Sequence, residues 1–221
     1  MKVLALSDLH GELRIIDSVR SLIAKRRYDA IFLAGDIADN GDTGYVESLL
    51  DMLENIPVFI IPGNMDDESV RSLLASSDTY IEQRSTTFKT KYTLFGIGGG
   101  LRGPFHTPYE FYDDELWPKL ENVRLNEPSI VLSHTPPFGY FDDIGSEVHI
   151  GSRSVLQFMH SVQPFILVCG HVHEHRGHLK VGDTNIVKLG PAKKGNAAEM
   201  DFSYLSKEKN ELKVNWIELF K

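Results

Sequence analysis

Five apolar runs in this chain are each followed by a short polar motif with a side chain able to bind a metal ion. The runs are VLAL, AIFLA, VFII, IVL and FILVC, and the motifs after them are Asp8-Leu9-His10, Gly35-Asp36, Gly63-Asn64, Ser133-His134 and Gly170-His171-Val172-His173. Buried strands of α/β proteins end together at one edge of a sheet, where loops hold polar groups away from the core. The pattern therefore predicts one site built from several strand ends.

The motifs together offer two aspartates, one asparagine and four histidines. Residues two apart in an extended segment point to the same side, so Asp8 and His10 can reach one ion, and the pair at 171 and 173 repeats this geometry. Such ligands suit two divalent transition metals that share a bridging carboxylate, a role for which Asp36 is suited. Each motif alone is also a common turn. The ordered set, with gaps of about 25 residues between the first three, favours the metal site.

Charge counting points to an anionic substrate. Two divalent ions bring +4 and two aspartates bring −2, which leaves +2, and a hydroxide that bridges the ions lowers the total to +1. A phosphodiester carries a single negative charge and suits such a site, while phosphomonoesters stay open. The ions would also lower the pKa of the bridging water and neutralise charge on the phosphoryl oxygens.

The composition argues against several other kinds of protein. The 221 residues include 23 basic and 31 acidic side chains, and the net charge of −8 disfavours long nucleic acid as a partner. No apolar stretch reaches the roughly 20 residues that span a bilayer. The N-terminal apolar run is too short for a signal peptide, and Cys169 is the single cysteine, so no intramolecular disulfide is possible. We therefore expect a cytoplasmic protein with no membrane partner, and a homo-oligomer stays open.

The spacing of apolar residues predicts a single domain, residues 1–221, of the α/β class. Strands are expected at 2–7, 30–34, 57–61, 79–83, 91–97, 129–132 and 165–169, and helices at 12–26, 43–54, 66–75, 109–121 and 152–162. The apolar face of the first helix comprises Leu13, Ile16, Val19 and Ile23, and Asp66 is the expected cap of the third helix. The last third is expected to be antiparallel β, with hairpin turns at 181–184 and 207–210 and a final strand at 212–219. Two packed sheets with helices outside follow from this pattern.

Two loops are expected beside the site. The first, residues 96–108, is rich in Gly and Pro and carries Arg102 and His106. Arg102 is either a bidentate donor to a phosphate oxygen or a solvated loop residue, and His106 has the same two alternatives. The second loop, residues 135–150, is long enough to form a lid or rim.

The motifs D-L-H, G-D-I-A-D, G-N-M-D, S-H and G-H-V-H resemble those of the calcineurin-like metallophosphoesterase superfamily over residues 8–173. This resemblance implies a four-layer α-β-β-α sandwich, in which two mixed β-sheets are flanked by helices. It implies one metal held by Asp8, His10, Asp36 and His173, and another held by Asp36, Asn64, His134 and His171. Asp39 would orient a ligand histidine. The ions would be Mn, Fe, Ni, Zn or Co, because four imidazoles disfavour Ca and Mg.

The activity that the resemblance implies is that of a dinuclear phosphoesterase. A metal-bridging hydroxide would attack the phosphorus of a small phosphate ester, with phosphodiesters as the first choice. The catalytic residues would be Asp36, Asn64, His134 and Asp66. The substrate contacts would be Asn64, Arg102 and His106.

The chain departs from the family pattern at one position. Many members have His after the Asn, where it assists catalysis by protonating the leaving group, but here the residue is Met65, which has no proton to donate. One alternative is a leaving group that needs no acid. Another is proton donation by His106 or His149. A third is a metal-binding scaffold or protein-interaction module of the same fold with an impaired catalytic site.

Overall fold

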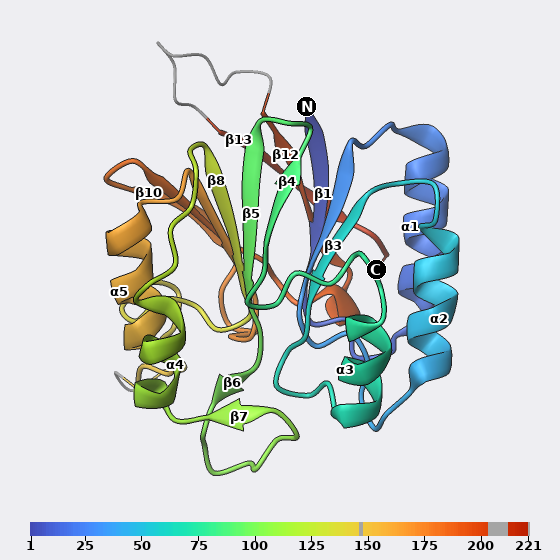
Figure 1. Cartoon of the computed structure of the whole chain (residues 1–221). Helices are drawn as coiled ribbons and strands as arrows, with labels where there is room; N and C mark the ends of the chain where they lie inside the picture. The colour runs from blue at the N-terminus through green and yellow to red at the C-terminus, as the bar shows by residue number, and fades with distance from the viewer. Residues whose placement is uncertain (146–147, 203–211, 221) are drawn as a thin grey trace.

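The first half of the chain alternates buried strands with amphipathic helices, as the sequence predicts (Figure 1). The computed structural model describes residues 1–145, 148–202 and 212–220. The elements of this half are β1 (Lys2–Leu6), α1 (Leu13–Lys25), β2 (Ala30–Ala34), α2 (Thr43–Met52), β3 (Val58–Ile61) and α3 (Glu68–Ala75). The three strands pair in parallel, which requires crossover helices between them. Their carboxyl ends therefore lie at one edge of the sheet.

The second half builds another sheet and returns to the first. Its elements are β4 (Ser85–Phe88), β5 (Tyr92–Ile97), β6 (Gly100–Leu101), β7 (Glu110–Phe111), α4 (Asp113–Leu120), β8 (Ser129–Ser133), α5 (Arg153–Val162), β9 (Ile166–Cys169), β10 (Gly177–Val181), β11 (Thr184–Lys188), the 3₁₀ turn η1 (Ala192–Lys194), β12 (Asn196–Asp201) and β13 (Lys213–Glu218). One sheet has the order β13-β12-β1-β2-β3 and the other β10-β11-β9-β8-β5-β4. Strands β5, β8 and β9 run parallel, so their carboxyl ends also share one edge.

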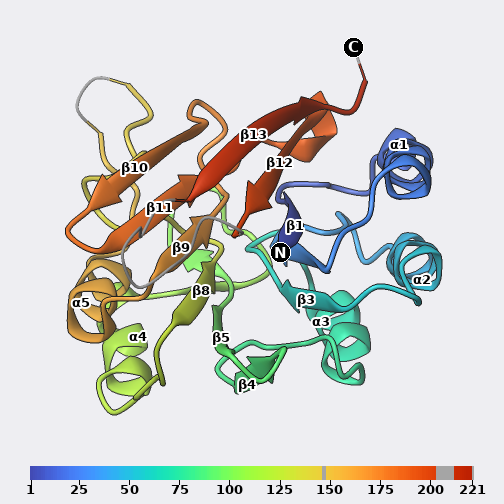
Figure 2. The same ribbon diagram turned by 90° about the horizontal axis from the view of Figure 1, so that it is seen from above.

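The two sheets pack face to face and helices cover their outer faces (Figure 2). Helices α1, α2 and α3 lie on one side, and α4 and α5 lie on the other. Buried side chains from both sheets, such as Phe32 and Ile130, form the cluster between them. This arrangement confirms the predicted four-layer α-β-β-α sandwich of two mixed sheets. No helix in the described ranges is long and apolar enough to cross a membrane.

Several local predictions were wrong. Leu13 is 69% exposed at the start of α1, whereas Ile15, which the helical spacing omitted, is buried. The edge strand lies at Ser85–Phe88 rather than at 79–83, where only isolated bridges occur. The antiparallel β expected in the last third is present where β12 pairs with β13, but the pairing of β12 with β1, between the two ends of the chain, was not predicted. The hairpin at 181–184 is confirmed. The one expected at 207–210 lies outside the described residues.

Candidate metal centre

The five motifs meet where strands of both sheets end, at the lower edge of Figure 1. Asp8 follows β1, Asp36 follows β2 and Asn64 follows β3, while the histidine motifs follow β8 and β9. Backbone contacts join neighbouring turns within each sheet. Asp8 N–H donates to the Gly35 carbonyl at 2.9 Å, and Gly170 N–H donates to the His134 carbonyl at 3.0 Å. Between the sheets, His171 N–H donates to Asp8 Oδ1 at 3.1 Å. The sandwich therefore brings motifs more than 150 residues apart in the sequence into one cluster.

Asp36 lies between two histidines from different motifs. Its Oδ2 is 3.6 Å from Nε2 of His10, and its Oδ1 is 3.4 Å from Nε2 of His134. The side chain is buried, and the N–H of Met65 donates to Oδ1 at 2.8 Å. One carboxylate thus presents an oxygen toward each side of the cluster, which is the arrangement that a bridging ligand needs.

His10 and His173 lie on one side of Asp36. Ligand atoms of Asp8, His10 and His173 lie within 4.8 Å of one another, which is close enough for one ion. The His10 Nδ1 proton is donated to Oδ1 of Asp39 at 2.7 Å, which leaves the lone pair on Nε2. Among the described residues, this Nε2 is buried and has no hydrogen-bond partner. A buried acceptor without a donor is costly, so the geometry fits a cation at this point.

His134 and His171 lie on the other side, with ring centroids 5.1 Å apart. His134 Nδ1 donates to the Ala34 carbonyl at 2.8 Å, which directs Nε2 toward Asn64 Oδ1, 3.0 Å away. Ligand atoms of Asp8, Asp36 and His134 form a second group within 4.8 Å. Carboxylate, amide and imidazole donors in two adjoining groups fit two divalent cations.

The backbone of the cluster is held in an uncommon conformation. Four of the predicted ligands have positive φ angles, namely Asp8 (58°), His10 (51°), Asp36 (52°) and His171 (74°). Left-handed backbone at a non-glycine residue costs roughly 1–3 kcal/mol and is common at functional sites. Gly63 is required for a different reason. A Cβ there would lie 2.1 Å from Oδ1 of Asp36, so the Asn64 turn can approach Asp36 only with glycine.

Mutual electrostatics shift the pKa values of the buried ligands. Burial is the largest influence on Asp36 and would raise its pKa, but the charge and hydrogen bond of His134 and the charge of His10 together outweigh it, and the pKa falls. Burial would lower the pKa of His134, but Asp36 raises it to about 9. Burial and the charge of His134 lower the pKa of His171 to about 4. Near pH 7, a cation must therefore displace a proton from His134 in order to bind there.

Asp66 does not face the open side of the cluster. It is fully buried, and its carboxylate accepts N–H groups of Ile37 at 2.9 Å, Ala38 at 3.0 Å and Gly63 at 2.7 Å. It thereby joins the turn after β2 to the turn after β3. The helix cap predicted for Asp66 is made instead by Asp67, which accepts from the start of α3. We therefore treat Asp66 as a positioning residue in place of the catalytic residue predicted.

The predicted substrate contacts Arg102 and His106 lie on the segment from β6 to β7. Tyr109 N–H in this segment donates to the Asn64 carbonyl at 2.9 Å, which docks the segment beside the cluster. The Arg102 guanidinium, however, donates to the Tyr112 hydroxyl at 2.7 Å. His106 is exposed with a φ of 49°. Neither side chain belongs to the two ligand groups.

Two supporting residues were missed by the sequence reasoning. Ser7 is buried, and its hydroxyl donates to Asp8 Oδ2 at 2.6 Å. In the sequence, only its position directly before Asp8 indicates that Ser7 could contact a ligand. Asp142 is buried in the loop after β8 and accepts from the Gly139 and Gly151 N–H groups and from His149. No sequence pattern marks Asp142, because these partners are set by the folded loop.

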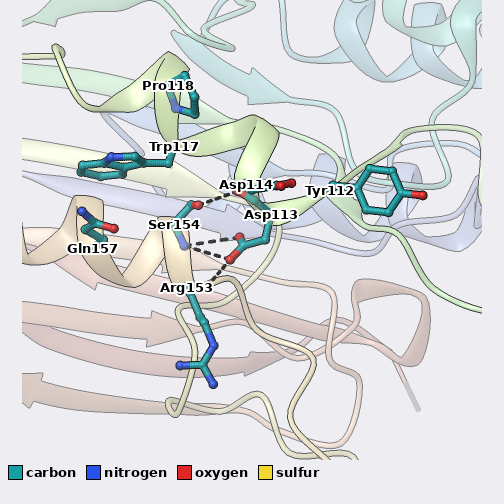
Figure 3. A pocket seen from close by; sticks show the side chains of 8 residues that line it. All are labelled: Tyr112, Asp113, Asp114, Trp117, Pro118, Arg153, Ser154 and Gln157. Carbon is teal, nitrogen blue, oxygen red and sulfur yellow. Dashed lines mark hydrogen bonds between the residues drawn. The ribbon is translucent and has the colours of Figure 1, made fainter.

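A cavity of about 540 Å³ lies between α4 and α5 (Figure 3). It is lined by Tyr112, Asp113, Asp114, Trp117, Pro118, Arg153, Ser154 and Gln157. The Asp113 carboxylate faces the start of α5 and accepts the Arg153 N–H at 3.0 Å. None of these lining residues is a predicted ligand, so this cavity is separate from the metal centre.

Comparisons with known proteins agree with this fold. A family model described as calcineurin-like phosphoesterase matches residues 1–175. The uncharacterized protein MJ1162 of Methanocaldococcus jannaschii is 33% identical over 198 residues, 86% of this chain and 88% of that protein. The probable cyclic nucleotide phosphodiesterase CBUA0032 of Coxiella burnetii is 28% identical over 62% of this chain and 60% of its own length. The crystal structure of TT1561 of Thermus thermophilus has the same fold, with a TM-score of 0.70, 18% identity and 97% of each chain covered.

Proposed function

This chain belongs to the calcineurin-like phosphoesterase family, and we propose that it hydrolyses phosphate esters with two divalent transition metal ions. The observation that supports this most is the position of Asp36, whose two oxygens face His10 on one side and His134 on the other. The buried Nε2 of His10, without a hydrogen-bond partner in the described part of the chain, points the same way.

The assignment of ligands is part of this proposal. One ion would be held by Asp8, His10, Asp36 and His173, and the other by Asp36, Asn64, His134 and His171. The histidine rings pair in the same way. The ring centroids of His10 and His173 are 5.5 Å apart, and those of His134 and His171 are 5.1 Å apart. Asp8 is also within reach of the second group, so its carboxylate adds negative charge to both.

When bound, the ions would supply an activated water and neutralise charge on the phosphoryl group. The protein residues do the rest. Asp39 and the Ala34 carbonyl fix the tautomers of His10 and His134, so that Nε2 of each ring faces the site. The Ser7 hydroxyl and the His171 N–H orient the Asp8 carboxylate. Because these side chains are already oriented, the protein needs little reorganisation when the ions and the substrate bind.

We propose phosphodiesters as the substrate class, with manganese among the usable ions. A site of net charge near +1 matches a singly charged diester. The relative named as a probable cyclic nucleotide phosphodiesterase supports the same class. Met65 is partly exposed beside Asp36 and offers no proton, so esters with good leaving groups should react fastest.

The test is hydrolysis of an aryl phosphodiester by metal-stripped protein with Mn, Ni, Zn, Co or Mg added back. Asp36→Ala is expected to remove activity and at least one bound ion. Asp17→Ala is the matched control, because the Asp17 side chain is 80% exposed on α1. Full activity with normal metal content in Asp36→Ala would rule out the assignment.

The alternative is a metal-binding scaffold of the same fold, which the missing acid at Met65 keeps open. Two ions bound per chain with no turnover on any ester would favour it. Turnover that returns with metal and disappears in Asp36→Ala would exclude it.

A further inference from the structure

Lys188 is a buried lysine that the proposed reaction does not use. It is the last residue of β11, and its side chain is fully buried. Lysine is rarely buried to this extent unless it is paired, because an ammonium group is strongly hydrated in water. A lysine retained at such a position calls for a specific partner.

The partners of Lys188 are backbone carbonyls. Its Nζ donates to the Leu189 carbonyl at 2.6 Å and to the His175 carbonyl at 3.4 Å. Within the described ranges, no carboxylate lies close enough to form an ion pair with it. Burial lowers the pKa of Lys188, while the negative charge of Asp8 opposes this change. The Lys188 amine is therefore held by hydrogen bonds to two backbone carbonyls rather than by an ion pair.

Lys188 lies next to the segment that carries two predicted metal ligands. It pairs with Cys169 on β9, and Cys169 is followed directly by residues 170–175. The near end of this segment is fixed where His171 N–H donates to Asp8 Oδ1 at 3.1 Å. The far end is fixed at His175, whose carbonyl accepts from Lys188 and whose Nε2 lies 2.7 Å from the Asp143 carbonyl. Between these anchors lie the two ligand histidines.

We propose that Lys188 is a positioning residue for the metal centre, because its buried side-chain amine donates to the His175 carbonyl and so fixes His171 and His173, one for each ion. This inference rests on the proposed function and extends it to a residue outside the ligand set. Loss of an outer contact of this kind lowers metal affinity by about 10–100-fold in other metal sites.

A role for the charge alone makes the opposite prediction. A positive charge near the site repels a divalent cation, so its removal would tighten metal binding. A role in packing alone predicts lower stability with unchanged affinity in the folded protein. The sign of the change in metal affinity therefore separates positioning from both.

The experiment is calorimetric titration of Mn²⁺ into metal-stripped wild type, Lys188→Met and Lys188→Arg, with folding checked by circular dichroism. Methionine keeps the length and apolar volume but donates no hydrogen bond. We expect affinity to fall by about 10-fold or more in Lys188→Met, and to recover to within about threefold of wild type in Lys188→Arg. Lys180→Met, which removes an exposed charge from the paired strand β10, is the control and should bind as wild type does.

Affinity in Lys188→Met that equals or exceeds that of wild type would overturn the inference. So would an equal loss in Lys188→Arg. If Lys188→Met does not fold without metal, Lys188→Leu, which also donates no hydrogen bond, takes its place and the same loss is expected. A wild type that binds no Mn²⁺ would instead count against the proposed function, so the two failures are distinguishable.

Discussion

The floor and the rim of the site are built in different ways. The floor, which comprises Asp8, Asp36, Asn64 and His134, is buried and each side chain has a defined partner. The rim, which comprises residues 98–111 and 135–145, carries exposed groups such as Phe105, 86% exposed, and Ile144, 44% exposed. Buried groups with fixed partners can hold ions at set positions, whereas exposed loops can change without disturbing the core. We infer that the floor decides the chemistry and the rim decides which ester enters.

Adding one methyl group to a glycine is expected to affect the floor far more than the rim. Gly63→Ala would place a Cβ 2.1 Å from Asp36 Oδ1, so the Asn64 turn must move away from Asp36. We expect loss of metal binding and about 1–3 kcal/mol of stability, measured by calorimetry and urea unfolding. On the rim, a Cβ at Gly103 meets only the Leu101 carbonyl at 3.9 Å. Comparable losses in Gly103→Ala and Gly63→Ala would remove the distinction.

Metal removal should loosen the floor and leave the rim unchanged. Left-handed backbone at Asp8, His10 and Asp36 is stabilised when their side chains bind cations. Each ion at a hundredfold excess over its Kd adds about 2.7 kcal/mol of stability. Thermal unfolding with and without a chelator measures the total stabilisation by metal, and hydrogen exchange shows which residues the metal stabilises. Increased protection at residues 103–107 on metal addition would contradict the prediction.

Met65 lies between floor and rim, and replacing it tests whether an acid is missing. Met65→His should raise the hydrolysis of alkyl esters by up to about 100-fold and that of activated aryl esters by much less. The measurement is kcat/KM for a matched pair of esters in both proteins. Equal rates for aryl and alkyl esters in the wild type would point to a proton donor already present on the rim.

The pH dependence of metal affinity should show the protonation of His134 in the floor of the site. Asp36 raises the pKa of His134 to about 9, so below that pH the ring holds a proton that a cation must displace. From this group alone, metal affinity should rise by about tenfold per pH unit toward pH 9 and then level off. Calorimetry in buffers of different ionisation enthalpy counts the released proton. No proton release near pH 7 would exclude His134 as a ligand.

The smallest effect is expected on the rim. Arg102→Ala removes a side chain that donates to Tyr112 and belongs to the segment docked on Asn64. If Arg102 turns to contact a phosphate oxygen, KM should rise by a factor that corresponds to about 1 kcal/mol, with metal content unchanged. Steady-state kinetics on an aryl diester measure this. Lower metal content in Arg102→Ala would instead indicate that Arg102 supports metal binding, as the floor residues do.

The contrast between floor and rim also explains which predictions were confirmed. The apolar runs and the motifs after them identified the parallel strands β1, β2, β3, β8 and β9, since a buried strand shows in its own composition. Parallel strands end at one edge, so the motifs were expected to meet. Features that depend on distant partners were missed, among them the pairing of β12 with β1 and the edge strand β4.

The sequence by itself determined the class of fold and the residue types that meet at the strand ends. Only the tertiary structure decided how those residues are held. In the folded chain, the Asp66 carboxylate accepts hydrogen bonds from three backbone N–H groups. His10 Nδ1 donates to Asp39, and the buried Lys188 donates to the His175 carbonyl. These partners lie on other elements, and their distances follow from packing of the two sheets. Local patterns report what a residue can do, while long-range packing selects which neighbour it meets.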